Sequence, residues 1–205
     1  MHNNPERLTQ SGEPMQQPMQ QSQQQSQANN AIVLKYINTP LGKMIAGATD
    51  DGLACLLFTD VAKLNAVLKR IGQHTGTTPL SQPLSQSTST HHPIIERTEQ
   101  QLDEYFAGKR TAFDIPLAAL GTDFQQASWQ YLQSIPYGHT STYQAQANAL
   151  NRCKAVRAVA NANAKNPIGI IVPCHRVIGS NGKLTGYAGG LDRKAALLEL
   201  ESANQ

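Results

Sequence analysis

The spacing of apolar residues changes near residue 120, and this change constrains the fold more than any other feature. The first half contains short apolar runs separated by tight turns, at residues 31–36, 43–48 and 53–58. Such runs predict three antiparallel strands, and helical spacing predicts helices over residues 61–71 and 94–106. After Gly121 the pattern is mostly helical. We therefore expect an α+β chain, with a sheet-plus-helix domain over residues 31–115 and a mostly helical domain over residues 116–205.

Two segments have compositions that oppose a packed core. Residues 1–30 contain nine Gln, three charged residues and no Val, Ile, Phe, Trp or Tyr. They cannot bury enough apolar surface to offset the entropy of ordering, so we expect a disordered tail. Residues 72–90 are rich in Gly, Ser, Thr, Gln and Pro, which predicts a long flexible loop. The chain shows neither a secretory signal nor a run of 18 apolar residues, so we expect no export and no membrane partner.

The second half contains a candidate helix-turn-helix. A short helix is expected to end near Leu150, and a turn leads into a further helix at about residues 153–163. The second helix would turn Val159 inward and a basic face with small residues outward, at Lys154, Arg157, Ala158 and Asn161. Two short helices joined by a tight turn are typical of DNA-binding proteins. An ordinary helical hairpin is the alternative.

The charge distribution favours a polyanionic partner. Residues 1–115 carry nine Lys/Arg against ten Asp/Glu, whereas residues 116–205 carry eight against four. No acidic residue occurs between Asp123 and Asp192, a window that holds six Lys/Arg. A long segment without carboxylates fits nucleic acid as the partner, although an ordinary solvated face would also accommodate it.

Cysteine and histidine usage points to a reducing compartment without a metal site. The odd count of three cysteines, with no close pair, is typical of a cytoplasmic protein. The six histidines do not cluster at the spacing of metal ligands. The tandem His91-His92 is the nearest approach to a metal site, and we interpret it as the opening of the helix that follows.

Cys174 is the candidate for a chemical role. It follows the apolar run at residues 168–172, which should form a buried, strand-like segment, and it precedes His175 and Arg176. Only a thiolate acts as a nucleophile, and neighbouring cations raise the thiolate fraction. A buried, inert thiol is the alternative. Glu201, near the end of the last predicted helix, could orient an imidazole, although carboxylates at such positions are usually solvated.

Two segments around Cys174 carry a specific pattern, Ile171-Val-Pro-Cys-His-Arg-Val177 and Gly179-Ser-Asn-Gly-Lys-Leu-Thr-Gly-Tyr-Ala-Gly-Gly-Leu191. They resemble the active-site signature of the O6-alkylguanine-DNA alkyltransferases, the methylated-DNA–protein-cysteine methyltransferases. The likeness continues upstream in Gly121-Thr-Asp-Phe-Gln-Gln126 and Lys154-Ala-Val-Arg-Ala-Val159, and in the first half in Gln101-Leu-Asp-Glu-Tyr-Phe-Ala-Gly108. It covers nearly all of residues 31–201.

The resemblance implies a fold and an activity. The first domain would be RNase H-like, and the second would be a winged-helix-like, helix-turn-helix domain. The alkyl group of O6-alkylguanine in double-stranded DNA would pass irreversibly to Cys174 after base flipping, in a single-turnover suicide reaction. O4-alkylthymine stays open as a second substrate. No cofactor is implied, because the damaged base is itself the alkyl donor, and we expect a monomer.

The resemblance also implies roles for matching residues. Cys174 would accept the alkyl group, His175 would take its proton through a water, and Glu201 would hold His175. Tyr143 would help to protonate the departing guanine, and Asn166 would brace the turn before the active site. The other positions fall into two groups. Arg157 would fill the gap left by the flipped nucleotide, and Ala158, Lys154 and Arg176 would also contact the DNA. The extruded base would contact Tyr187, Ala188, Gly189, Val172 and Pro173.

Four positions depart from the family pattern. The family usually has Glu, Leu, Gly and Pro where this chain has His139, Gln146, Asn151 and Cys153. Losing the leucine is expected to loosen the first short helix, and losing the glycine and proline to alter the turn into the recognition helix. We expect these changes to affect affinity and stability more than chemistry.

Two other functions compete with alkyl transfer. A DNA-binding regulator or lesion-flagging protein would bind without reacting, but relatives that only bind have a different residue at the acceptor position. A cysteine hydrolase would need an oxyanion hole, which the sequence does not reveal. Cys174 therefore favours alkyl transfer.

Overall fold

The computed structural model describes residues 32–76 and 91–205. The predicted tail and most of the predicted loop at residues 72–90 lie outside the described residues. The first half contains the elements β1 (Val33–Thr39), β2 (Gly42–Thr49), β3 (Gly52–Phe58), α2 (Leu64–Thr75) and α3 (Pro93–Phe106). All five were predicted by type. Residues 72–75 correct the loop prediction, because they extend α2 by a further turn before Gly76 ends it in the left-handed conformation.

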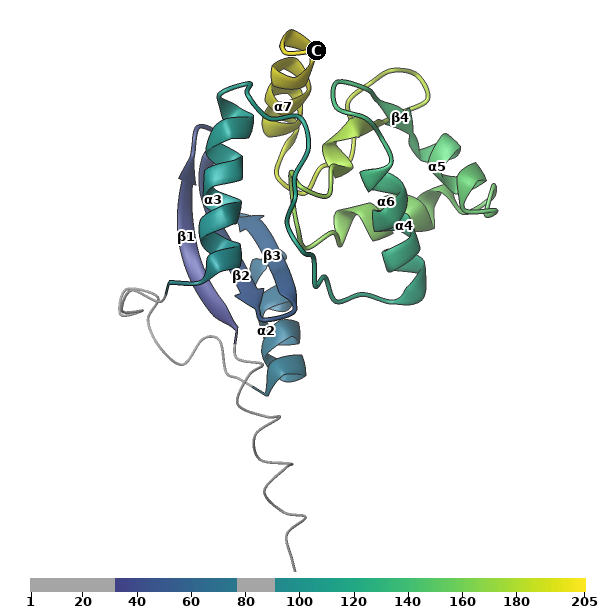
Figure 1. Cartoon of the computed structure of the whole chain (residues 1–205). Coiled ribbons are helices and arrows are strands. Elements are labelled where there is room, and N and C mark those ends of the chain that lie inside the picture. The colour runs from purple at the N-terminus through teal and green to yellow at the C-terminus, as the bar shows by residue number, and fades with distance from the viewer. Residues whose placement is uncertain (1–31, 77–90) are drawn as a thin grey trace, which may run out of the picture.

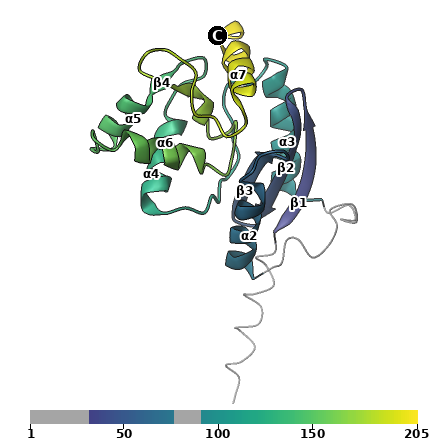
Figure 2. The same cartoon turned by 180° about the vertical axis from the view of Figure 1, so that it is seen from behind.

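The three strands form an antiparallel sheet in the order β1-β2-β3, with α2 and α3 on opposite faces (Figures 1 and 2). Successive side chains of a strand point to opposite faces, so both faces need apolar residues. Met44 and Ala46 pack with α3, whereas Ile45 and Leu57 pack with α2. This explains why β3 is buried at every position.

The free edge of β3 is covered by two segments from later in the chain. Leu53 exchanges backbone hydrogen bonds with Pro116 and Ala118, at 2.8 and 2.9 Å. Leu56 donates to the Pro167 carbonyl at 2.9 Å and accepts from the Gly169 amide at 2.8 Å. A sheet edge with unpaired backbone groups is a site of unwanted pairing. Here that edge docks the sheet onto the second half of the molecule.

The second half is helical, as predicted. Its elements are α4 (Asp123–Gln133), β4 (Ser141–Thr142), α5 (Tyr143–Ala149), α6 (Val156–Ala164), the 3-10 turn η2 (Cys174–Arg176), β5 (Val177–Ile178) and α7 (Leu191–Ala203). The short strands β4 and β5 pair in parallel. In both views α7 runs along the boundary between the two halves (Figures 1 and 2). The core is continuous across this boundary, because Trp129 and Leu132 of α4 join the cluster on the α3 side of the sheet.

Helix α4 has a capped N-terminus. The Thr122 hydroxyl accepts from the Gln125 amide, and the Gln125 side chain accepts from the Thr122 amide, which is a complete capping box. The helix buries Trp129, whose indole donates to the Ala162 carbonyl of α6 at 2.9 Å. Helix α4 is therefore joined to α6 through Trp129.

The apolar run at residues 168–172 is buried but is not a strand, which corrects that part of the prediction. Ile170 has φ 68°, a left-handed conformation that interrupts any extended ladder. The run instead makes a compact turn, with Ile171 donating to the Gly169 carbonyl and Val172 to the Ile168 carbonyl. The apolar composition of residues 168–172 therefore predicted their burial correctly but their extended, strand-like backbone wrongly.

Two of the four residues that depart from the family pattern, Gln146 and Asn151, fit their places in the structure. Gln146 is fully buried and donates to the Ser128 carbonyl at 3.0 Å, while its amide exchanges hydrogen bonds with that of Asn163. Gln146 therefore joins α4, α5 and α6 by hydrogen bonds, and the loosening of the first short helix stays a prediction. Asn151 adopts φ 54° in the turn between α5 and α6. Asparagine tolerates this conformation better than most residues, so it can stand where a glycine is usual.

Within residues 32–76 and 91–205, no helix combines the length and the apolar composition needed to cross a membrane.

The buried amide pair predicts a specific coupling. Gln146→Leu should lower the free energy of unfolding by about 1–3 kcal/mol, because it leaves the Asn163 amide buried without its partner. Adding Asn163→Ala should recover part of this loss in a double-mutant cycle measured by urea unfolding. Gln130→Leu, an exposed change on α4, is the control and should shift stability by about 0.5 kcal/mol or less. Strict additivity of the two core changes would contradict the coupling.

Candidate active site

Cys174 lies at the start of the 3-10 turn that follows the buried run, and its side chain is 7% exposed. The other two thiols have different surroundings. Burial raises the pKa of Cys55 to about 12, so this thiol is inert, and Cys153 is exposed in the turn before α6. Of the three cysteines, only Cys174 directly precedes a buried histidine that contacts a carboxylate.

Asn166 connects α6 to the turn that leads to Cys174. Its side-chain amide donates to the Val172 carbonyl at 2.8 Å and lies 3.4 Å from Cys174 Sγ. Its side-chain oxygen accepts from the Ile168 amide at 3.0 Å. Because Asn166 follows α6 directly and is fully buried, these three bonds fix the turn that leads to Cys174.

His175 is held by Glu201 in one tautomer. His175 Nε2 lies 2.8 Å from Glu201 Oε1, and both side chains are fully buried. Burial lowers the pKa of His175, and Glu201 only partly offsets this, so the imidazole is neutral near pH 7. A carboxylate can only accept, so Nε2 carries the hydrogen and Nδ1 keeps its lone pair. That Nδ1 is buried and has no hydrogen-bond partner within residues 32–76 and 91–205, so it is available as a proton acceptor.

Glu201 is a buried anion with several donors. Arg176 donates from Nε to Oε2 at 2.9 Å and from Nη2 to Oε1 at 3.0 Å, and Tyr105 and the Gly138 amide donate at 2.8 and 3.2 Å. Burial alone would raise the pKa of Glu201, but the hydrogen bonds from His175 and Arg176 and the charge of Arg176 outweigh it and hold the pKa at about 2. Glu201 is therefore ionised at any physiological pH, contrary to the solvated alternative.

Arg176 does not lie on the surface, which corrects its assignment to DNA. Its guanidinium donates to the Glu201 carboxylate and, at 2.6 Å, to the Ile135 carbonyl. It also lies 5.7 Å from the centre of the Tyr137 ring. The side chain is 7% exposed. A buried ion pair needs such complete hydrogen bonding to offset desolvation. Arg176 therefore orients the carboxylate instead of contacting a ligand.

Tyr143 faces the same site from α5. Its hydroxyl donates to the carbonyls of Thr185 and Gly186, at 3.1 and 3.0 Å. Burial raises the pKa of Tyr143 to about 12, with a further contribution from the charge of Cys174, so the hydroxyl stays protonated and can donate. Gly186 is required there, because a Cβ would lie 2.7 Å from the tyrosine oxygen at φ 62°.

A small cavity adjoins Cys174. It measures about 20 Å³, room for about one water molecule and not for a purine. Three predicted base-contacting residues, Tyr187, Ala188 and Gly189, line it together with Cys174. Val172 and Pro173 are also buried, but Val172 borders a separate cleft with Ile115 and Trp129. The structure thus brings together part of the predicted base pocket.

The predicted DNA-contacting side chains of this segment are exposed, Arg157 and Ala158 on α6 and Lys154 in the turn before it, because α6 begins at Val156 and not near residue 153 as predicted. Lys154, Arg157 and Ala158 are exposed, whereas Val159 and Ala162 are buried. Arg157 has no ion-pair or hydrogen-bond partner in the described part of the chain. The helix-turn-helix therefore presents a cation and small residues outward, as its sequence predicts.

Sequence reasoning missed several residues that build the site. Tyr105 of α3 and Gly138 contact Glu201 from segments far away in the sequence. Lys194 is fully buried on α7 and donates to the carbonyls of Val177 and Thr185, at 2.5 and 2.6 Å. Burial lowers the pKa of Lys194 to about 8, with an opposing effect from the charge of Cys174. The sequence signal for Lys194 was its place among the apolar positions of the last helix. A lysine is rarely buried without partners, so a buried position there would indicate a set of hydrogen-bond acceptors.

Comparisons with known proteins agree with this geometry. Residues 32–119 match the ribonuclease-like domain of 6-O-methylguanine DNA methyltransferase, and residues 123–203 match its DNA binding domain. A methylated-DNA–protein-cysteine methyltransferase of Methanosarcina barkeri is 57% identical over 111 residues, which are 54% of this chain and 70% of that protein. The crystal structure of Mycobacterium tuberculosis O6-methylguanine methyltransferase is 39% identical, with a TM-score of 0.67, and the match covers 85% of this chain and 95% of that one.

A structure of the Mycobacterium tuberculosis protein in complex with DNA matches at 39% identity and a TM-score of 0.66, covering 83% of this chain and 93% of that one. A sheet domain joined to a helix-turn-helix domain with a buried cysteine centre defines the class of DNA alkyl-repair proteins. The chain belongs to the 6-O-methylguanine DNA methyltransferase family.

Replacing Glu201 by Gln tests the buried carboxylate. At pH 7 the change leaves Arg176 buried without a counter-charge, and we expect a loss of roughly 3–5 kcal/mol in the free energy of unfolding. The pKa of Glu201 is held at about 2, below the ordinary value of about 4.3. The wild-type advantage is therefore complete above about pH 4.3 and shrinks as the pH falls toward 2.

Urea unfolding at a series of pH values measures this difference. Glu199→Gln, an exposed change on the same helix, is the matched control and should be close to neutral throughout. A difference between wild type and Glu201→Gln that stays constant down to pH 2 would show that the carboxylate charge is not what stabilises the fold.

Proposed function

We propose that this protein repairs alkylated DNA directly, by transferring the alkyl group from O6 of guanine in double-stranded DNA to Cys174. The observation that carries the proposal is the buried relay beside the thiol. His175 offers an unpartnered Nδ1, Glu201 fixes the tautomer, and Asn166 holds Cys174 Sγ at 3.4 Å. Membership of the family supports the same activity.

The proposed reaction needs no cofactor. The thiol of Cys174 gives its proton to His175 through a water, and the thiolate attacks the alkyl carbon. The sulfur–carbon bond forms as the carbon–O6 bond breaks, and its electron pair goes to the guanine. The Tyr143 hydroxyl donates a proton to the departing base and regains one from the relay. The products are guanine and S-alkylcysteine. Because the carbon–sulfur bond of a thioether is stable, the Cys174 thiol is not regenerated and each molecule reacts once.

The alkylated base must leave the DNA duplex before it can react with Cys174. A purine stacked in a duplex cannot reach a thiol that is 7% exposed, so the nucleotide must leave the stack, which costs a few kcal/mol. The cavity of about 20 Å³ must also widen to admit it. The exposed loop at residues 180–186, next to Tyr187, is the segment we expect to move. Arg157 would occupy the gap left in the duplex, with Lys154 and Ala158 against the backbone.

We propose that the protein acts as a monomer in a reducing, cytoplasmic compartment. The relay, the cavity and the exposed face of α6 all come from a single chain. The three cysteines are free thiols in the structure, and Cys174 must stay reduced to react.

Stoichiometry tests the single-turnover reaction. Duplex carrying O6-methylguanine should yield one equivalent of repaired guanine per protein and then stop. Intact-mass and peptide mass spectrometry should place one methyl group on the Cys174 peptide, with Cys55 and Cys153 unmodified. Turnover beyond one equivalent, or a DNA complex without methyl transfer, would refute the proposal. Cys174→Ala should still bind duplex but transfer nothing.

Arg157→Ala separates base extrusion from chemistry. Removing the side chain that stabilises the extruded state should slow transfer from duplex by about tenfold or more, since each 1.4 kcal/mol is tenfold. Reaction with free O6-benzylguanine base needs no extrusion and should change little. The salt dependence of binding should fall by about one phosphate contact. Arg152→Ala, an exposed arginine before α6, is the control. Equal slowing of both substrates would contradict the role of Arg157.

A further inference from the structure

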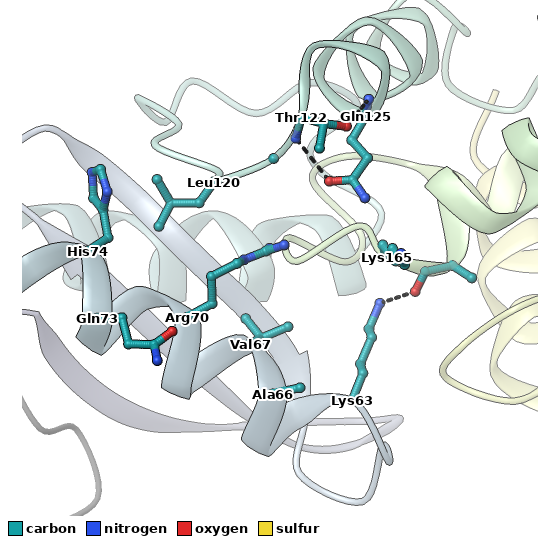
Figure 3. A pocket seen from close by; sticks show the side chains of 12 residues that line it. Lys63, Ala66, Val67, Arg70, Gln73, His74, Leu120, Thr122, Gln125 and Lys165 are labelled. Atoms are coloured by element: carbon teal, nitrogen blue, oxygen red, sulfur yellow. Dashed lines mark hydrogen bonds between the residues drawn. The ribbon is translucent and has the colours of Figure 1, made fainter.

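Lys63, which precedes α2 in the first domain, reaches across the domain boundary. Its Nζ donates to the Ala164 carbonyl at 2.9 Å and to the Asn166 carbonyl at 2.6 Å. Figure 3 shows this side chain crossing from the α2 side of an interdomain cleft of about 960 Å³ to the end of α6. The two carbonyls belong to the end of the recognition helix and to the turn that carries Asn166.

The ammonium of Lys63 has no carboxylate partner in the described part of the chain, although its side chain is partly buried. It lines the same small cavity as Cys174 and Asn166. Burial lowers the pKa of Lys63, and the charge of Cys174 raises it in part. A cation without a carboxylate beside a reactive thiol is the arrangement that favours a thiolate.

We infer that Lys63, a residue of the first domain, is a positioning residue for alkyl transfer. It holds the Asn166 turn in place and favours the thiolate form of Cys174. The inference rests on the proposed role of Cys174 as the acceptor. The link runs through Asn166, whose carbonyl is held by Lys63 while its amide holds the Val172 carbonyl and Cys174 Sγ. The sheet domain thus completes the active site instead of only supporting it.

Other charged and titratable groups also face Cys174. Lys194 approaches from α7, Tyr143 from α5 and Tyr187 from the loop before α7, and His175 is its neighbour in η2. Lys194 is engaged by the Val177 and Thr185 carbonyls, and the two tyrosines stay protonated because burial raises the pKa of each. Lys63 differs from these groups because it belongs to the first domain and contacts the Asn166 turn.

The test compares full-length Lys63→Met, Lys63→Arg and Lys69→Met. Lys69 is exposed on α2, so its replacement removes the same charge without touching the site. Two reactions are followed from pH 6 to 9: alkylation by free O6-benzylguanine base, and carboxamidomethylation of the Cys174 peptide by iodoacetamide. Both avoid DNA binding. Thermal unfolding of each variant is recorded in parallel.

Lys63→Met should slow both reactions near pH 7 by about tenfold, equivalent to about 1.4 kcal/mol, and should move the pH–rate profile to higher pH. Lys63→Arg should restore most of the rate, and Lys69→Met should match wild type. The inference is overturned if Lys63→Met reacts like wild type at every pH. It is also overturned if the profile stays in place and arginine fails to rescue, because Lys63 would then be merely structural.

The two proposals fail in different ways. A wild-type protein that reacts with iodoacetamide at Cys174 but never with O6-benzylguanine or methylated duplex would refute alkyl transfer. The iodoacetamide profiles of the Lys63 variants would still decide whether this lysine sets the reactivity of Cys174.

Discussion

The buried carboxylate of Glu201 is the interaction on which the rest of the centre depends. It accepts from His175 and Arg176 next to Cys174 in the sequence, from Tyr105 on α3 of the sheet domain, and from the Gly138 amide after α4. Since a buried anion is tolerated only when its lone pairs are satisfied, these partners must all be in place together. One carboxylate therefore couples the tautomer of the imidazole to the docking of the two domains.

Backbone hydrogen bonds also hold the two domains together. The edge of β3 is completed by residues 116–118 and 167–169, and the second of these segments is the turn that leads to Cys174. The sheet consequently acts as a rigid support against which Asn166 and the buried run are held. Arg193 of α7 adds an outer clamp, with its guanidinium paired to Asp60 at 2.9 and 3.0 Å and lying 4.0 Å above the ring of Phe58.

Local pattern predicted the elements well and long-range contacts poorly. Apolar runs separated by turns indicated the three strands of the sheet, and helical spacing indicated α2 and α3. Helix α6 was also expected, although it begins at Val156 and not near residue 153. The run at residues 168–172 was taken for a strand, because apolar composition reports burial and not the left-handed backbone of Ile170. The motif indicated Cys174, His175 and Glu201. It could not indicate Tyr105 or Lys63, whose contacts cross the domain boundary, nor the inward turn of Arg176.

The covered edge of β3 has a consequence for how the chain is made. On the ribosome, β3 emerges well before residues 116–118 and 167–169, the segments that pair with Leu53 and Leu56. Until they arrive, the nascent chain presents an open, wholly apolar strand, the kind of edge that invites pairing with other chains. How long this edge stays open therefore depends on how quickly translation delivers the later segments.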